Sequence, residues 1–119
     1  MKPGDTFLIP DWAGAHLHFI LSALPDGSVI VAHFTSRRAY TDDTCVIKPG
    51  EHPFVKKETI VRYDQAHICP AANLASLEGS IIRKLEPLSD ELLARIQQGA
   101  LSSPQTPDKI KKLIRDNNP

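Results

Sequence analysis

Residues 15–34 read AHLHFILSALPDGSVIVAHF, and this stretch decides the fold. In residues 15–24 the odd positions Leu17, Phe19 and Leu21 are apolar, while the even positions are mostly polar, with Ile20 as the exception. Side chains on a strand alternate between two faces, so the pattern predicts a strand with one buried face. Residues 25–28 favour a turn, because proline fixes the backbone and glycine tolerates positive φ. The apolar run at 28–34 then completes a predicted β-hairpin.

Outside this hairpin the sequence predicts further short strands and then helices. The predicted strands are residues 6–9, 45–47, 59–68 and 81–85, with a helical turn at 71–77. Two helices follow, one at 88–101 with Ser89 as its N-cap and one at 106–116 that begins at Pro107. Strands first and helices last predict a single α+β domain, mainly β, over residues 1–119, with 106–116 as a C-terminal helical extension. A small, strongly bent antiparallel barrel with a C-terminal helix fits this order best.

The composition narrows the possible functions. The chain has 119 residues, with 14 basic and 14 acidic side chains, so its formal net charge is zero. RNA binding would therefore need a local basic patch, since no overall field attracts nucleic acid. No apolar run approaches the ~20 residues that span a bilayer, no leader pattern opens the chain, and Cys45 and Cys69 lack CxxC spacing. We expect a cytoplasmic protein with reduced thiols, no membrane association and no nucleotide cofactor.

Residues 60–65, Ile-Val-Arg-Tyr-Asp-Gln, carry the clearest candidate chemistry. If they form a strand, Arg62 and Asp64 lie two positions apart and point to the same face. A cation beside a carboxylate can bind a phosphate and move a proton, which is enough for phosphodiester chemistry without a metal. A surface ion pair with little energetic effect is the alternative interpretation.

Histidines and hydroxyls on the predicted hairpin are further candidates. His16 and His18 share one strand face, and His33 is on the neighbouring strand. Three histidines could bind zinc, so a metal-dependent domain is one hypothesis; sheet-face histidines with hydrogen-bond partners, or one catalytic histidine, are the others. His67 and Cys69 form a second possible pair, with an equally weak signal. Thr35 and Ser36 end the apolar strand, where hydroxyl and backbone N–H groups can hold a phosphate.

In order and spacing, the chain resembles the PemK/MazF/Kid family of toxins from type II toxin–antitoxin systems. The segments that carry the resemblance are Gly4 to Leu8, Phe19 to Ser22, Val29 to Ser36, Ile60 to Gln65, and Leu88 to Leu101. Residues 29–36 end in Thr-Ser as the third strand of the family does, and residues 60–65 are similar to the family strand Val-Val-Arg-x-Asp-Gln.

The resemblance implies an SH3-like β-barrel that forms a homodimer and is inhibited by an antitoxin protein. It also implies cleavage of single-stranded RNA at short sequences, without metal or cofactor, by attack of the 2′-hydroxyl on the adjacent phosphate. Asp64 would then be the general base, and Arg62 would neutralise the phosphate. His16 would replace a histidine of the first loop. Thr35 and Ser36 would hold the phosphate, and His18 is a further substrate-binding candidate.

One departure from the family opens an alternative function. The loop between the first two strands is shortened to residues 11–15, and the Arg-Pro position of the family aligns with His16 and Leu17, so its arginine is absent. Without such a charged partner for the phosphate, binding weakens by on the order of 1.5–3 kcal/mol. Protonated His16, or Arg37 and Arg38 from the next loop, are the candidates to replace it. The alternative is a catalytically degenerate PemK-like domain that binds a protein partner.

Overall fold

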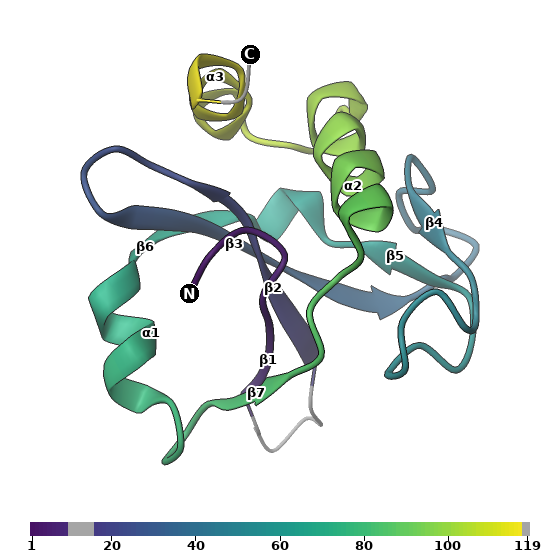
Figure 1. Ribbon diagram of the computed structural model, residues 1–119. Helices are drawn as coiled ribbons and strands as arrows, with labels where there is room; N and C mark the ends of the chain where they lie inside the picture. The colour runs from purple at the N-terminus through teal and green to yellow at the C-terminus, as the bar shows by residue number, and fades with distance from the viewer. Residues whose placement is uncertain (10–15, 118–119) are drawn as a thin grey trace.

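An antiparallel sheet built around one long hairpin forms the centre of the molecule (Figure 1). The computed structural model describes residues 1–9 and 16–117, and within these residues the sheet has seven strands in the order β4-β5-β3-β2-β1-β7, with β6 also paired to β3. The strands are β1 (Thr6–Ile9), β2 (His16–Ala23), β3 (Ser28–Ser36), β4 (Val46–Ile47), β5 (Thr59–Val61), β6 (His67–Pro70) and β7 (Arg83–Leu85).

The strand β3 is shared by two partners on the same edge, and this bends the sheet. Its last residues, Phe34 to Ser36, pair with β5, whereas its first residues, Ser28 to Val31, pair with β6. A register shift between Ile20 and Ser22 adds a bulge to β2, and bulges increase local bending. The prediction of an α+β, mainly β, fold with C-terminal helices is confirmed. The hydrogen-bonded ladders do not close into a full barrel over the described strands.

Both faces of the central hairpin are covered, which explains why Ile20 departs from the alternating pattern. Leu17, Phe19 and Leu21 pack into a core with residues of the C-terminal helices. Ile20 points to the opposite side, where Phe7 and Leu74 belong to a second, smaller core. Figure 1 shows α2 and α3 on one side of the sheet and α1 on the other.

The helices follow their sequence signals closely. They are α1 (Ala71–Leu77), α2 (Asp90–Ser102) and α3 (Asp108–Asn117). Ser89 is the N-cap of α2, and its side chain accepts a hydrogen bond from the Leu92 N–H at 3.1 Å. The apolar stripes of α2 and α3 are buried in the larger core through Leu92, Ile96, Ile110 and Ile114. Of the helices in the described residues, none is long and apolar enough to cross a membrane.

The predicted strand at residues 59–68 is wrong in its middle. The chain instead forms β5, a 3-10 turn at Tyr63–Gln65, and then β6. Val61 pairs with Phe34 and His67 pairs with Val31, so only Ala32 and His33 stand opposite residues 62–66. The excess residues must leave the ladder, and the tight turn accommodates them.

Candidate functional site

A pocket of about 500 Å³ lies where β2 begins and β3 ends, and it contains most of the predicted site residues. Its wall is formed by these two strand ends, by the end of β5 and the 3-10 turn, and by the loop after β3. The lining residues are His16, Thr35, Ser36, Arg38, Tyr40, Thr41, Asp42, Ile60, Val61, Arg62, Asp64 and Gln105.

Arg62 and Asp64 form a two-pronged ion pair in this wall. Arg62 Nε donates to Asp64 Oδ1 and Arg62 Nη2 donates to Asp64 Oδ2, each at 2.9 Å. The hydrogen bonds from Arg62 hold the pKa of the Asp64 carboxyl below its usual value, and those to Asp64 raise the pKa of Arg62. Both side chains are more than a third exposed, so the pair contributes little to stability. Asp64 therefore holds the Arg62 guanidinium in one orientation and also offsets its charge, so an anion entering the pocket meets an oriented hydrogen-bond donor and not a free cation.

The residue between them, Tyr63, explains why they share a side. Its side chain is 1% exposed, and its hydroxyl donates to the Ile96 carbonyl of α2 at 2.7 Å. With Tyr63 directed into the core, the neighbouring side chains of the 3-10 turn point outward. Arg62 and Asp64 thus lie together as predicted, although the cause is a turn anchored by a buried tyrosine and not strand alternation.

His16 presents a proton-accepting nitrogen. Its Nδ1 lies 3.1 Å from the Phe34 carbonyl oxygen. A carbonyl only accepts hydrogen bonds, so Nδ1 carries a proton and, in neutral imidazole, Nε2 carries the lone pair. The start of β2 brings this ring to the same pocket as Arg62 and Asp64.

His33 lies beside the other two histidines of the hairpin, and its pKa responds to the charges of Arg62 and Asp64. Its ring centroid lies 5.3 Å from that of His16 and 5.1 Å from that of His18, and His18 stacks on Phe7 at 5.5 Å. Burial, together with the positive charges that His18, His16 and Arg62 can carry, lowers the pKa of His33 to about 4, while Asp64 acts in the opposite direction. His33 is therefore neutral at physiological pH.

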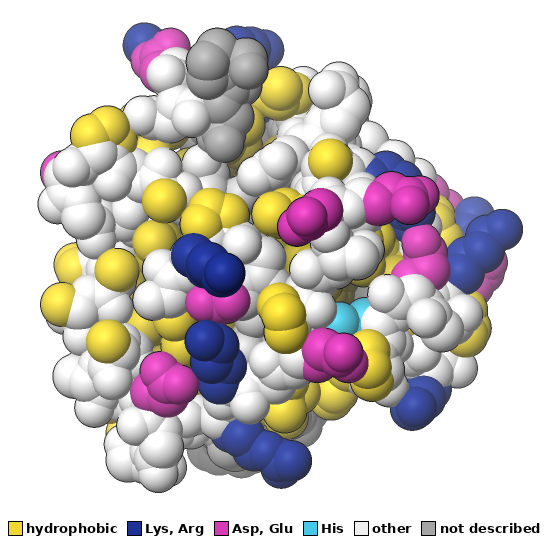
Figure 2. All heavy atoms as spheres, in the orientation of Figure 1, with side chains coloured by type: hydrophobic (Ala, Val, Ile, Leu, Met, Phe, Trp, Pro, Cys, Tyr) yellow, Lys and Arg dark blue, Asp and Glu magenta, His cyan; other side chains and the backbone are white. Residues whose placement is uncertain are grey.

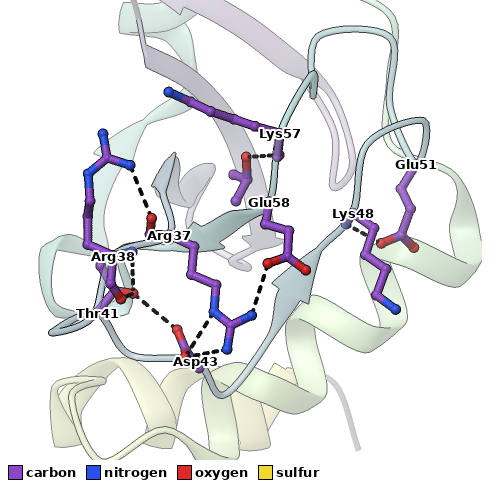
Figure 3. Close-up of polar contacts among 9 residues, drawn as sticks. Arg37, Arg38, Thr41, Asp43, Lys48, Glu51, Lys57 and Glu58 are labelled. Carbon is purple, nitrogen blue, oxygen red and sulfur yellow. Dashed lines mark hydrogen bonds and ion pairs between the residues drawn. The ribbon is translucent and has the colours of Figure 1, made fainter.

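The remaining predicted substrate-binding residues divide into two groups. Thr35, Ser36 and Arg38 line the pocket. His18 and Arg37 are not among its lining residues. Figure 3 shows Arg37 turned to two carboxylates, Asp43 and Glu58, each at 3.0 Å, so its charge is already neutralised. The guanidinium of Arg38 instead donates to a backbone carbonyl.

Six lining residues were not among the predicted site residues: Ile60 and Val61 of the segment that holds Arg62, and Tyr40, Thr41, Asp42 and Gln105 outside it. Tyr40 is 85% exposed, and an exposed aromatic next to two arginines is a signal for nucleic-acid binding that was available in the sequence. Asp42 accepts a hydrogen bond from buried Ser103, just after α2, which ties the loop to the C-terminal helices. That long-range contact has no sequence signal.

The zinc hypothesis finds no support in the geometry. Within residues 1–9 and 16–117, no group of three or more His, Cys, Asp or Glu side chains is arranged to hold a metal ion. The ring of His33 instead contacts the rings of His16 and His18. Cys45 and Cys69 are free thiols. The shortened loop at 11–15 lies outside the described residues.

No family model and no curated protein matches the chain.

Proposed function

We propose that the protein is a metal-independent endoribonuclease of the PemK/MazF type that acts on single-stranded RNA. One observation carries the proposal: a guanidinium, a carboxylate that orients it and an imidazole with an accepting nitrogen line one pocket, with two hydroxyl side chains beside them. The residues are Arg62, Asp64, His16, Thr35 and Ser36. This set can bind a phosphate and accept a proton next to it.

In the proposed reaction, His16 Nε2 accepts the proton of the ribose 2′-hydroxyl. The 2′-oxygen attacks the adjacent phosphorus, the bond from phosphorus to the 5′-oxygen breaks, and a 2′,3′-cyclic phosphate forms. The departing 5′-oxygen takes a proton from water, and the protonated His16 gives its proton to the resulting hydroxide, which restores the neutral imidazole. Arg62 neutralises the charge on the phosphate oxygens, with Thr35 and Ser36 as further hydrogen-bond donors.

Asp64 has a different role here from the general base that the family resemblance implies. Its pKa is lowered by the hydrogen bonds from Arg62, which makes it a weak proton acceptor. We assign it to orienting Arg62. Inhibition by an antitoxin and homodimer formation accompany the proposal through the resemblance alone, and a cytoplasmic location accompanies it as an expectation from the sequence.

The test is incubation of the purified protein with mixed-sequence single-stranded RNA in EDTA. We expect cleavage to survive chelation and to fall by roughly 10²–10⁴-fold in His16→Gln, the range for loss of a general base. Asp64→Asn should also reduce the rate, because Arg62 loses its fixed orientation. Lys109→Gln, exposed on α3, is the control that should cleave normally.

Absence of cleavage by the folded wild-type protein, with or without EDTA, would contradict the proposal. It would favour the degenerate domain that binds a protein partner. Cleavage that EDTA abolishes would instead point to a metal-dependent reaction.

A further inference from the structure

A second pocket, also of about 500 Å³, adjoins the candidate site. It shares His16, Thr35 and Ser36 with the first pocket, so these residues form a wall between the two. Its other lining residues are Leu17, Phe34, Phe54, Val55, Lys56, Lys57 and Thr59. A polymer bound across the first pocket can therefore continue into the second.

The segment Phe54–Lys57 gives this pocket an aromatic ring and two cations. Phe54 is 39% exposed, which is high for a phenylalanine, while the next residue, Val55, is buried. Lys56 and Lys57 are exposed and form no ion pair with any described residue. In Figure 3 the Lys57 side chain points away from Glu58, which is engaged by Arg37.

A buried histidine holds this segment in place. His52 is 3% exposed, and its Nε2 donates to the Glu86 carbonyl at 2.6 Å. Its Nδ1 accepts from the Phe54 N–H at 3.1 Å, and its carbonyl accepts from the Val55 N–H at 2.9 Å. Phe54 therefore has a backbone fixed before any ligand arrives, which lowers the entropic cost of binding.

Lys56 and Lys57 bring positive charge to this pocket on a surface of mixed charge. Lys and Arg side chains lie beside Asp and Glu side chains across the face in Figure 2, in keeping with zero net charge. Together with Arg38, the two lysines give the two pockets cations that no described carboxylate neutralises. Unpaired cations beside an exposed ring are what a single-stranded nucleic acid requires: charge along the backbone and a surface on which a base stacks.

We propose that the second pocket is a subsite for the nucleotide next to the cleaved phosphate, with the base on the Phe54 ring and its phosphate near Lys56 and Lys57. The inference rests on the proposed function, since it takes single-stranded RNA as the ligand. It adds a binding determinant on the segment between β4 and β5, outside the reacting groups.

The test uses a fluorescein-labelled, mixed-sequence decamer of 2′-O-methyl RNA, which lacks the attacking hydroxyl and is not cleaved. Fluorescence anisotropy with the full chain gives Kd. Phe54→Ala should weaken binding about tenfold, a typical effect of losing one stacked base, while Phe54→Trp should retain it. Phe54→Leu, which keeps an apolar side chain without the ring, should resemble Phe54→Ala.

The lysines are tested by salt dependence. Replacing Lys56 and Lys57 together by Gln should make the slope of log K against log salt shallower by about 0.7 for each phosphate that the lysines neutralise. Lys109→Gln is the matched control, because this lysine is exposed on α3 and lines neither pocket. Its slope should equal that of the wild type.

The outcomes separate the subsite from the catalytic proposal. Undetectable binding by the wild type, or binding that Phe54→Ala and the double lysine variant leave unchanged, would overturn the subsite even if RNA is cleaved. Binding that depends on Phe54 in a protein that cleaves no RNA would uphold the subsite and overturn the catalytic proposal.

Discussion

At the scale of single residues, Tyr63 determines where the side chains of Arg62 and Asp64 point. Burying its ring and bonding its hydroxyl to α2 fixes the 3-10 turn, and the turn directs Arg62 and Asp64 into the pocket. The same contact explains a glycine in α2. A Cβ on Gly99 would collide with the Tyr63 hydroxyl, so the helix carries no side chain there.

The pH dependence of RNA cleavage distinguishes His16 from Asp64 as the base. With His16 as base, acidification should lower the activity, because a protonated imidazole cannot accept the proton of the 2′-hydroxyl. With Asp64 as base, activity should resist acidification, since Arg62 holds the pKa of Asp64 below its usual value. The measurement is kcat/KM between pH 4 and 8 on one oligonucleotide. A rate that stays flat down to pH 4.5 would remove His16 from the proposed role.

The residues of the site were predictable where local pattern decides their position. Strand ends place His16, Thr35 and Ser36 together. Spacing predicts that Arg62 lies beside Asp64, although the contact of Tyr63 with α2 is what places them there. Arg37 was not predictable in the same way, because its partner Glu58 lies 21 positions further along the chain and only the fold brings them together. Two adjacent arginines thus have different environments.

At the scale of elements, β2 and β3 place histidines directly opposite each other. His18 pairs with His33 in the ladder, and the ring of His16 contacts that of His33. Protonating His33 puts a charge into a half-buried site next to other groups that can become positive. The hairpin is therefore a source of acid sensitivity.

We predict that stability rises with pH between about 4 and 6.5. Because the pKa of His33 is about 4 in the folded chain and near 6.5 when unfolded, the unfolded state binds more protons in this window. The stabilisation from neutral His33 is fully present above pH 6.5 and is lost as the pH falls to 4. After allowance for partial exposure, we expect the free energy of unfolding to fall by about 1–2 kcal/mol across this window. Urea unfolding at several pH values measures it.

The variant His33→Gln should flatten this dependence. The carboxyl of Glu51 provides an internal reference, since hydrogen bonds from Arg95 lower its pKa to about 2 and its contribution disappears at lower pH, between about 4.5 and 2. An unchanged slope between pH 4 and 6.5 in His33→Gln would contradict the assignment.

A second prediction at this scale concerns the packing of α2 on the 3-10 turn. Alanine is a better helix former than glycine by about 1 kcal/mol, yet Gly99→Ala should destabilise the protein by about 1–3 kcal/mol, because the added methyl displaces Tyr63. Gln98→Ala, exposed on the same helix, should change stability by less than about 0.5 kcal/mol. A more stable Gly99→Ala protein, judged by urea unfolding, would mean that Tyr63 does not pack there.

The limits of element prediction follow from strand pairing. The hairpin and the helices were predictable because periodicity and caps are local signals. The segment 59–70 was not, because its break depends on β3 pairing with two strands in succession. Nothing within residues 59–68 indicates how many residues β3 leaves opposite them. Closure of the barrel depends on the same kind of long-range register.

At the scale of the whole molecule, the C-terminal helix belongs to the core. The sequence suggests that 106–116 is an extension of the domain, but Ile110 and Ile114 of α3 are 4% and 1% exposed and lie in the same core cluster as Leu17 and Phe19. The chain just before α3 also reaches the site, since Gln105 lines the first pocket and Ser103 bonds to Asp42. Loss of α3 should therefore affect both stability and the pocket.

We predict that Ile114→Ala lowers the free energy of unfolding by about 2–4 kcal/mol, the usual cost of truncating a fully buried isoleucine. The same truncation in an accessory helix packed loosely outside the core would lower the free energy of unfolding by much less. Lys112→Ala, on the exposed face of α3, tests whether substitution in the helix is itself harmful and should cost less than about 0.5 kcal/mol. Urea unfolding, monitored by circular dichroism, gives both values. If the two variants lower the free energy of unfolding by equal, small amounts, α3 is a dispensable extension. If unfolding is a single cooperative transition that shifts only with Ile114→Ala, α3 is part of the domain.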